Sequence, residues 1–392
     1  MSRRWVIDDE VAARLSRSTE KSNASSFRRM LWPTSAFVIV AIVVLLWNRN
    51  ASDSTALDSK QPTLESRATA PPPPRGARPP VAELPPARTG IVVCWGDNVS
   101  AACTPPPDLG LVRSVSAGGS HSAAIRADGR VVCWGAGQTN TQLGSDWGQS
   151  IVPADLLGAR AIASGGYHNL VIALDGSVAC WGRDKEGQCK VPDTLGSATS
   201  IAAGWFHSIA VTTRGEIVAW GSTSGRYNFG QSTIPDGLPP TSMVAGGYYH
   251  TIAVSLDGAV SCWGNNWFGQ CIVPENLGAV TAVAGGYYHS VALKRDGSVA
   301  CWGAGTTSLG TDPNFGQSIV PSALGPVCAI TAGGWITAAA QSSGAVTLWG
   351  QDCTKWNREP SGDAITWMLS AGEFHVIGLQ TELVRGSSSK LH

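Results

Sequence analysis

Charged residues, methionine and catalytic motifs are all scarce in this chain of 392 residues. Charged residues make up 14% of it and there are 4 methionines, which disfavours long helices rich in Lys, Glu and Leu. No Gly-x-Ser-x-Gly, His-Glu-x-x-His or phosphate-loop pattern occurs. Glu216 and Glu373 are isolated acids that we expect to be solvated. The sequence therefore predicts no enzyme activity, no cofactor and no metal site.

An excess of positive charge is also lacking. Lys+Arg and Asp+Glu both number 28. Residues 1–30 contain seven Lys/Arg against four Asp/Glu, whereas residues 90–380 contain 13 against 19. Nucleic-acid binding depends on a basic surface that neutralises phosphates. We therefore expect no nucleic-acid partner.

Long apolar runs are confined to one stretch near the N-terminus. Residues 36–47 are continuously apolar, and residues 31–48 carry no charge. A membrane-spanning helix needs about 20 predominantly apolar residues, and about 17 suffice. Residues 31–48 are therefore predicted to form a single transmembrane signal-anchor helix. A cleaved signal peptide and a soluble chain are the alternatives.

Flanking charges orient this predicted helix. Arg28 and Arg29 precede it, and only Arg49 follows closely. Because positively charged flanks stay in the cytoplasm, residues 1–30 are predicted to be a cytoplasmic tail, with the rest of the chain periplasmic or extracellular. Residues 49–89 contain several proline runs and are expected to form a disordered, extended linker that holds the next domain off the membrane.

Glycine and tryptophan are abundant, with 46 and 16 copies, and the tryptophans follow a repeat. A Trp-Gly pair occurs seven times, at spacings of 39, 47, 39, 43, 39 and 47 residues. A histidine stands thirteen residues before five of these tryptophans, a sixth histidine follows the last pair, and each histidine has a glycine three residues earlier. The tryptophans are Trp95, Trp134, Trp181, Trp220, Trp263, Trp302 and Trp349, and the histidines are His121, His168, His207, His250, His289 and His375.

Between each histidine and the next tryptophan lies Asp-Gly or a substitute dipeptide, flanked by apolar runs. This pattern predicts a two-residue hairpin whose two turn positions both have positive φ. Each unit is expected to contain three or four short strands, and a four-stranded unit of about 40 residues has the size of a propeller blade.

The two ends of the repeat region complement each other. Residues 91–96 give a Trp-Gly strand without inner strands, and residues 364–379 give inner strands without a Trp-Gly pair. Together they would complete a seventh blade and remove a free sheet edge. The predicted fold is all-β: a seven-bladed β-propeller over residues 90–380, closed by N- and C-terminal strands that share one blade. A transmembrane helix precedes it, and a tail at 381–392 follows.

The order Gly-x-x-His, Asp-Gly-x-Val-x-x-Trp-Gly and Gly-Gln resembles the regulator-of-chromosome-condensation repeat. The short period and the Gly-Gln-x-x-Val-Pro ending are similar to those of bacterial members, including β-lactamase inhibitory protein-II. The resemblance implies a propeller that binds a partner. It keeps open two alternative functions: guanine-nucleotide exchange on a small GTPase, as for the founding member, and inhibition of an envelope enzyme such as a β-lactamase.

The repeat tryptophans and histidines are interpreted as structural. The tryptophans would pack between blades, and each histidine would bond backbone between strands or blades. A metal ring is not expected, because zinc needs its ligands at about 2.0–2.1 Å from one ion.

Cysteines show a spacing of their own. In three repeats one cysteine precedes the tryptophan and a second follows the Gln position, while Ser replaces the second in other repeats. We predict a disulfide within each of these repeats, which fits an oxidising compartment. Cys328 and Cys353 share a repeat and could form a fourth bridge, whereas Cys133 and Cys301 are expected to be buried thiols. The three pairs are Cys94/Cys103, Cys180/Cys189 and Cys262/Cys271.

Aromatic residues outside the repeat frame gather in the first and third turns of each unit, which should open on one face. Exposed aromatic residues with little charge are typical of interface centres. We therefore predict a membrane-tethered extracytoplasmic module that binds a protein or an envelope ligand. The alternative is that half of these rings pack locally or line the axial channel. The candidate binding residues are Trp147, Tyr227, Phe229, Trp267, Phe268, Phe315, Tyr249, Tyr288 and Trp335.

Overall fold

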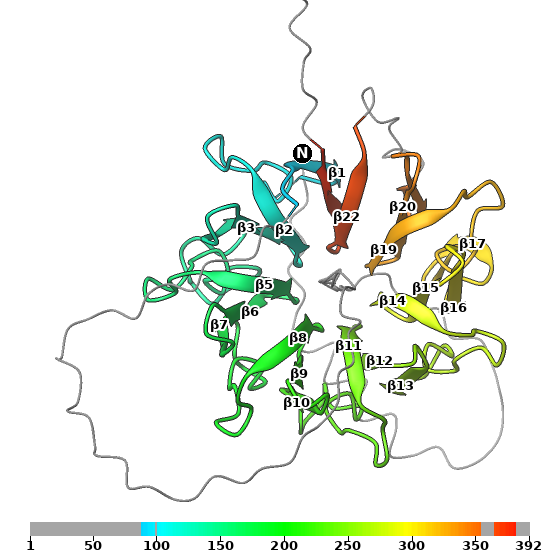
Figure 1. The fold of residues 1–392 in the computed structure, drawn as a ribbon, viewed down its shortest axis with the longest axis horizontal. Coiled ribbons are helices and arrows are strands. Elements are labelled where there is room, and N and C mark those ends of the chain that lie inside the picture. Colours follow the sequence, from blue (N-terminus) through cyan, green and yellow to red (C-terminus); the bar gives the residue numbers. More distant parts are fainter. Residues whose placement is uncertain (1–87, 99, 354–363, 382–392) are drawn as a thin grey trace, which may run out of the picture.

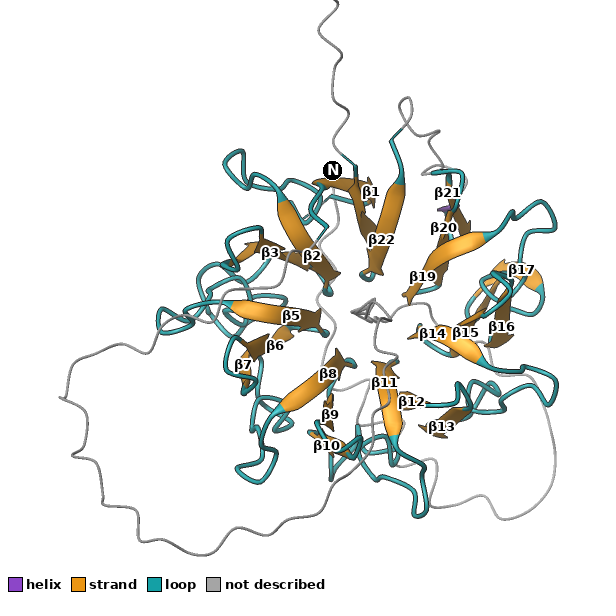
Figure 2. Cartoon of the chain, viewed as in Figure 1, coloured by secondary structure: helices purple, strands orange, loops and turns teal. Residues whose placement is uncertain are grey.

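The computed structural model describes residues 88–98, 100–353 and 364–381. The predicted cytoplasmic tail, the signal-anchor helix, nearly all of the linker and the C-terminal tail lie outside these residues. Within the described ranges, no helix is both long enough and apolar enough to span a bilayer. Figure 2 shows strands and loops with almost no helix.

The described chain forms seven three-stranded antiparallel sheets and one two-stranded sheet. The innermost strands contact one another in a closed cycle: β2, β5, β8, β11, β14, β19, β22 and back to β2. Figure 1 accordingly shows the sheets arranged radially around a central axis. The strands are β1 (Ile91–Gly96), β2 (Val112–Ala117), β3 (His121–Arg126), β4 (Val131–Gly135), β5 (Ala159–Ser164), β6 (His168–Ala173), β7 (Val178–Gly182), β8 (Ala198–Ala203), β9 (Ser208–Thr212), β10 (Ile217–Trp220), β11 (Thr241–Gly246), β12 (His250–Ser255), β13 (Val260–Gly264), β14 (Val280–Gly285), β15 (His289–Lys294), β16 (Val299–Gly303), β17 (Ser308–Thr311), β18 (Asn314–Phe315), β19 (Val327–Gly333), β20 (Ile336–Gln341), β21 (Val346–Gly350), β22 (Thr366–Ala371) and β23 (His375–Gln380).

The two ends of the described chain meet in one sheet, as predicted. β1 pairs antiparallel with β23, from Ile91 opposite Gln380 to Gly96 opposite His375, and the sheet order is β1-β23-β22. The N-terminal strand thus covers an edge that β23 would otherwise expose.

The Asp-Gly turns differ from the prediction. Only the glycine of each dipeptide has positive φ, for example 88° at Gly129. The Gly129 N–H donates to the Arg126 carbonyl (2.9 Å), and the Arg126 N–H donates to the Arg130 carbonyl (2.8 Å). The turn is therefore a longer loop that ends in a left-handed glycine, and the Asp128 carboxylate accepts from the Arg130 N–H (3.0 Å).

Hydrophobic clusters lie between neighbouring sheets. In one of them, Ile125 of β3 packs with Ile162 of β5 and Trp181 of β7. Six of the seven repeat tryptophans are buried, and Trp95 is half-buried. Packing between sheets is thus the role of these tryptophans, as predicted.

A hydrogen-bonded relay, here called the histidine relay, links successive sheets. His168 Nε2 lies 3.0 Å from Ser208 Oγ on the next sheet. Ser208 Oγ donates to the Gln188 carbonyl (2.7 Å), which also accepts from Trp220 Nε1 (2.8 Å). The histidine bond therefore crosses between sheets as predicted, but its partner is a side chain rather than backbone.

The same relay recurs around the ring, with Ser, Thr or Asn on the receiving sheet. Because the hydroxyl donates to the carbonyl, the imidazole Nε2 must carry the proton that the hydroxyl oxygen accepts. Nδ1 of five of these histidines has no hydrogen-bond partner, as expected for a neutral ring. The pairs are His121–Asn169, His168–Ser208, His207–Thr251, His250–Ser290, His289–Thr337 and His375–Ser122.

Burial keeps these rings uncharged. It lowers the pKa of His121 to about 4 and the pKa of the other five histidines to about 3. The glycine of the Gly-x-x-His motif makes room for the ring, since a Cβ at Gly118 would collide with the His121 imidazole.

Candidate functional site

The first and third turns of each repeat lie on one face, as predicted. Backbone N–H groups of the third turn donate to carbonyls of the first, as from Arg183 to Tyr167 (2.8 Å) and from Asn265 to Tyr249 (2.7 Å). Most aromatic side chains of these turns meet in one cluster, with two exposed rings at its edge. This surface, here called the aromatic face, comprises Tyr167, Trp205, Phe206, Tyr227, Phe229, Tyr248, Tyr249, Trp267, Phe268, Tyr287, Tyr288, Phe315 and Trp335.

The buried base of the aromatic face is a chain of ring contacts. Tyr167 meets Trp205 edge-on (5.1 Å between centroids), and Trp205 meets Tyr248 in the same way (5.5 Å). Tyr248 lies 5.4 Å from Tyr287, which meets Trp335 edge-on at 4.5 Å. Edge-to-face pairs of this kind each add about 0.5–1.5 kcal/mol beyond burial. The base is therefore a rigid platform.

Glu373 belongs to this base, which corrects the expectation that it is solvated. It is 2% exposed, and Tyr287 Oη donates to its Oε1 at 3.3 Å. Burial raises the pKa of the Glu373 carboxyl well above its usual range, which favours its protonated form. Glu216 is exposed as expected and pairs with Arg214 (2.7 Å).

The nine candidate binding residues divide by exposure. Trp267 (63% exposed) and Phe268 (41% exposed) project furthest into solvent. Trp267 meets Phe229 edge-on at 4.9 Å, and Phe268 lies 5.0 Å from Tyr288. The half-buried members are Tyr227, Phe229, Tyr288 and Phe315.

Three candidates are buried, contrary to the expectation of exposure. Trp147, Tyr249 and Trp335 are each 7% exposed. Tyr249 is covered because it packs against Phe206 (5.8 Å) and Phe229 (4.6 Å). These three rings can support a binding surface but offer it little area.

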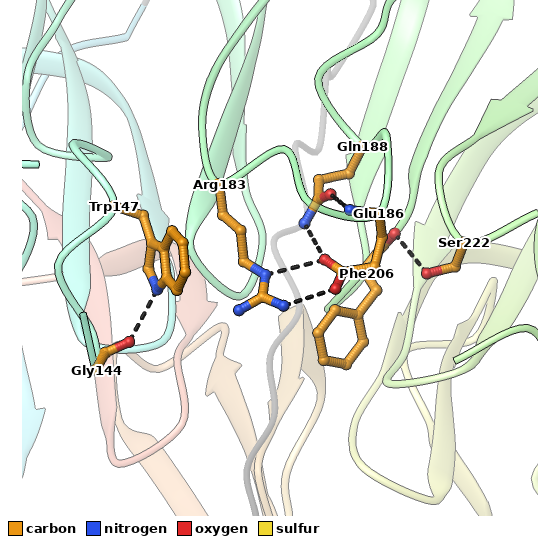
Figure 3. Close-up of polar contacts among 7 residues, drawn as sticks. All are labelled: Gly144, Trp147, Arg183, Glu186, Gln188, Phe206 and Ser222. Atoms are coloured by element: carbon orange, nitrogen blue, oxygen red, sulfur yellow. Dashed lines mark hydrogen bonds and ion pairs between the residues drawn. The ribbon is translucent and has the colours of Figure 1, made fainter. Parts of the chain in front are cut away.

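Trp147 lies apart from the cluster, beside a cationic corner that the sequence analysis missed (Figure 3). The guanidinium of Arg183 stands 4.7 Å from the Trp147 ring and 5.4 Å from the Phe206 ring. It also pairs with Glu186 through two hydrogen bonds of 2.9 and 2.6 Å. Lys185 Nζ lies 4.6 Å from the Trp147 ring. The sequence feature that could have indicated this corner is an Arg directly after Trp-Gly, with a Glu three residues after the Arg.

Backbone and amide contacts hold this corner in place (Figure 3). Trp147 Nε1 donates to the Gly144 carbonyl (2.8 Å), and Gln188 Nε2 donates to Glu186 Oε2 (3.3 Å). Ser222 Oγ donates to the Phe206 carbonyl (3.1 Å). The Arg183 charge is therefore neutralised locally, and the corner is not a free basic patch.

Two of the three predicted cysteine pairs are bonded. Disulfides join Cys94 to Cys103 and Cys180 to Cys189. Cys262 and Cys271 are unbonded, with their Sγ atoms 2.7 Å apart.

The remaining four cysteines are all unbonded. Cys328 and Cys353 do not form the suggested fourth bridge: Cys328 Sγ donates to the Ala340 carbonyl (3.4 Å), and Cys353 Sγ donates to that of Gln351 (3.3 Å). Cys133 and Cys301 are half-buried rather than fully buried as predicted, and the burial of their thiols raises the thiol pKa. Among the described residues, no three His, Cys, Asp or Glu side chains are grouped to hold a metal ion.

Three solved structures illustrate the similarity of this fold to known proteins. Prp20p of Saccharomyces cerevisiae matches with a TM-score of 0.61 and 18% identity, over 76% of this chain and 93% of its own. Human WBSCR16 matches with 0.58 and 20%, over 74% and 100%. The CRINKLY WD40 ectodomain of the Arabidopsis thaliana receptor kinase ACR4 matches with 0.51 and 19%, over 68% and 93%. At these identities the similarity shows the fold.

No curated protein matches this chain. The family model for the regulator of chromosome condensation (RCC1) repeat matches in five places, each spanning the three strands of one sheet and the turn that follows. The matched residues are 112–141, 159–188, 198–231, 242–270 and 280–307. This chain therefore contains RCC1 repeats and folds as an RCC1-like β-propeller.

Proposed function

We propose that this protein is a membrane-tethered, seven-bladed propeller that binds a protein outside the cytoplasm through its aromatic face, without catalysis. The observation that carries the proposal is the pair of exposed rings, Trp267 and Phe268, on a buried aromatic base. Large exposed aromatic side chains on a rigid support lose little conformational freedom on binding, so they serve well as interface anchors.

The chemistry around these rings favours an apolar protein contact. No charged residue occurs from Gly264 to Val273, and Ile272 is exposed at the end of the same loop. Leu309 and Ile319 of the next repeat are exposed as well. Aliphatic side chains gain free energy on binding mainly by burial against other apolar groups. A protein surface supplies such groups, whereas a polysaccharide of the envelope supplies them sparsely.

Two further observations support a location outside the cytoplasm. Disulfides persist in oxidising compartments, and two of them join strand to loop here. The fold is also found in a receptor kinase ectodomain. The proposed anchor at residues 31–48 rests on the sequence alone.

Guanine-nucleotide exchange is the second candidate. The observation that favours it is the similarity to Prp20p, a protein studied for its binding to Gsp1p and histones. A cytosolic propeller that accelerates nucleotide release from a small GTPase would support this candidate over the first.

The test uses photo-crosslinking in intact cells that express the full chain. A photoreactive phenylalanine analogue replaces Trp267 in one variant and the exposed Leu157, at the opposite end of the sheets, in the control. We expect a discrete protein adduct from position 267 and none from position 157, and we expect external protease to degrade the propeller. Equal adducts from both positions, or a propeller that external protease cannot reach, would contradict the proposal.

A further inference from the structure

Three third-turn loops share one short design. In each, the Gln position is the seventh residue after the repeat tryptophan, and an Asn or Asp side chain accepts from the N–H of the second cysteine. These bonds are Cys103 N–H to Asn98 (2.8 Å), Cys189 N–H to Asp184 (2.8 Å) and Cys271 N–H to Asn266 (2.9 Å). The three loops therefore have the same backbone arrangement.

Cys262 and Cys271 occupy the positions that are bonded in the other two short loops. Cys262 Sγ lies 3.5 Å from the Gln270 carbonyl, and Cys180 Sγ lies 3.5 Å from the Gln188 carbonyl. The two thiols face each other across the base of the loop, 2.7 Å apart. A third disulfide can form there without a change in the backbone path.

Longer third turns are closed differently. In them a serine replaces the second cysteine, and its hydroxyl donates to a carbonyl at the start of the loop. These bonds are Ser150 to Ala136, Ser232 to Gly221 and Ser318 to Ala304, each of 2.6 Å. Cysteine pairs thus occur where the loop is short, and a hydroxyl closes the loop where it is long.

The loop between Cys262 and Cys271 carries the most exposed rings of the aromatic face. Its internal bonds are all between uncharged groups. Asn265 Oδ1 accepts from the Trp267 N–H (3.2 Å) and from Gln270 Nε2 (2.8 Å), and Gln270 Oε1 accepts from the Phe268 N–H (2.9 Å). It contains no charged residue, so it lacks an ion pair like that of the corresponding Cys180–Cys189 loop. Its order therefore depends more strongly on closure at its base.

We infer that Cys262 and Cys271 form a redox-sensitive clamp that orders the loop presenting Trp267 and Phe268. This inference rests on the proposed function, since it assigns a regulation to the same binding face. Oxidation would fix both rings on their aromatic support, and reduction would loosen them.

The oxidant is a low-molecular-weight or protein disulfide. The Cys271 thiolate attacks one sulfur of that disulfide and releases one thiol. The Cys262 thiolate then attacks the Cys271 sulfur of the mixed disulfide and releases the second thiol. Two protein thiols lose two electrons and two protons, and the oxidant disulfide gains them as two thiols. Burial raises the pKa of the Cys262 thiol and so lowers its thiolate fraction. Cys262 therefore reacts second, after the mixed disulfide at Cys271 has formed beside it.

Thiol mapping and amide hydrogen exchange on the purified full chain test the clamp. After incubation with oxidised glutathione, we expect Cys262 and Cys271 to resist alkylation and to appear as one cross-linked peptide. Exchange in residues 264–270 should then be at least about tenfold slower than in Cys271→Ser. That variant carries the residue found at this position in the longer loops. The matched control, Cys189→Ser, should speed exchange only in residues 182–188.

Free Cys262 and Cys271 after oxidation would overturn the inference, as would equal exchange in the wild type and Cys271→Ser. A second variant, Cys262→Ser, guards against a folding defect confined to one substitution, because both should give the same exchange. The readout needs no binding partner. If the disulfide forms but position 267 yields no adduct, only the binding proposal is contradicted. If position 267 yields an adduct but the disulfide does not form, only this inference is contradicted.

Discussion

The histidine relay and the aromatic face are built from adjacent residues of the same turns, yet they behave oppositely. The relay histidine recurs unchanged in six repeats, whereas the residue just before it is Tyr in three of them, Phe in two and Ser in one. The histidine points into the contact between two sheets, where each sheet needs the same partner. The preceding residue lies in the first turn, and in four repeats it is a ring of the aromatic face. Strict repetition therefore indicates the structural position, and the mixture of Tyr, Phe and Ser is found on the proposed binding face.

One contact between sheets lacks the histidine, and it shows why the histidine and its partner occur together. In the repeat that lacks the histidine, Ile336 stands in its place, and Val376 replaces the hydroxyl residue on the next sheet. Both are buried in one hydrophobic cluster. The two polar partners are lost together, because either one alone would leave a buried polar group without its partner.

The largest expected difference between the histidine relay and the aromatic face is in how the free energy of unfolding responds to acid. The relay histidines have folded-state pKa values of about 3 to 4, below the ordinary value of about 6.5. The unfolded chain therefore binds more protons between these limits, and stability falls as the pH drops through that window. Each histidine contributes up to about 1.4 kcal/mol per pH unit.

Denaturant unfolding at pH 8, 6 and 5 measures this effect. His207→Gln should reduce the slope of the unfolding free energy against pH by the amount that corresponds to about one proton. A free energy of unfolding that stays constant from pH 8 to 5 would show that the relay histidines are not buried as neutral rings.

Tryptophan substitutions give the next largest contrast. Trp220→Ala removes a buried ring and one donor to the Gln188 carbonyl, and should cost about 3–5 kcal/mol. Trp267→Ala removes an exposed ring and should cost about 1 kcal/mol or less. Urea titration of both variants measures the difference. Equal losses of unfolding free energy would contradict the distinction between the structural positions and the aromatic face.

A double-mutant cycle at the apolar contact sharpens the comparison. Ile336→His and Val376→Ser should each cost about 1–3 kcal/mol, because each buries a polar group without a partner. The double variant restores the pair and should recover at least about 1 kcal/mol of the summed loss. Additive losses in chemical denaturation would mean that the relay pair cannot form at this contact.

Glu373→Gln should have the smallest effect. Burial raises the folded-state pKa of Glu373. Above the ordinary carboxyl pKa, the unfolded chain therefore loses a proton that the folded protein retains. The free energy of unfolding falls as the pH rises through this range. An uncharged amide removes that dependence. Thermal unfolding should therefore show a gain for the variant at pH 8 and little change at pH 4. A loss at pH 8 would mean that the carboxyl is ionised in the folded protein.

Local patterns in the sequence predicted most of the architecture. Trp-Gly spacing located the repeats, residues 91–96 and 364–379 predicted the shared closing sheet, and turn order placed the first and third turns on one face. The Cys-x8-Cys spacing anticipated the bonds at Cys94 and Cys180. These features are set within about 15 residues of chain or by the repeat period, so the sequence displays them directly.

Ring contacts could not be predicted in the same way. The partner of His168 is Ser208, 40 residues on, and Tyr287 meets Glu373 across 86 residues. Burial of Tyr249 and Trp335 likewise depends on rings from other repeats, and Trp147 is covered by Arg183 and Lys185 of the next repeat. Nothing local distinguishes an aromatic residue that will be covered from one that will stay exposed.

The sequence by itself determined that this protein is a repeat of short antiparallel strands with tryptophans between sheets, because alternation, turn residues and periodicity act over a few residues. Only the tertiary structure decided which rings are exposed, that Glu373 is buried, and which side chain receives each histidine. Those outcomes depend on closing the ring, which brings residues from separate repeats to within a few ångströms and fixes how much water each one keeps.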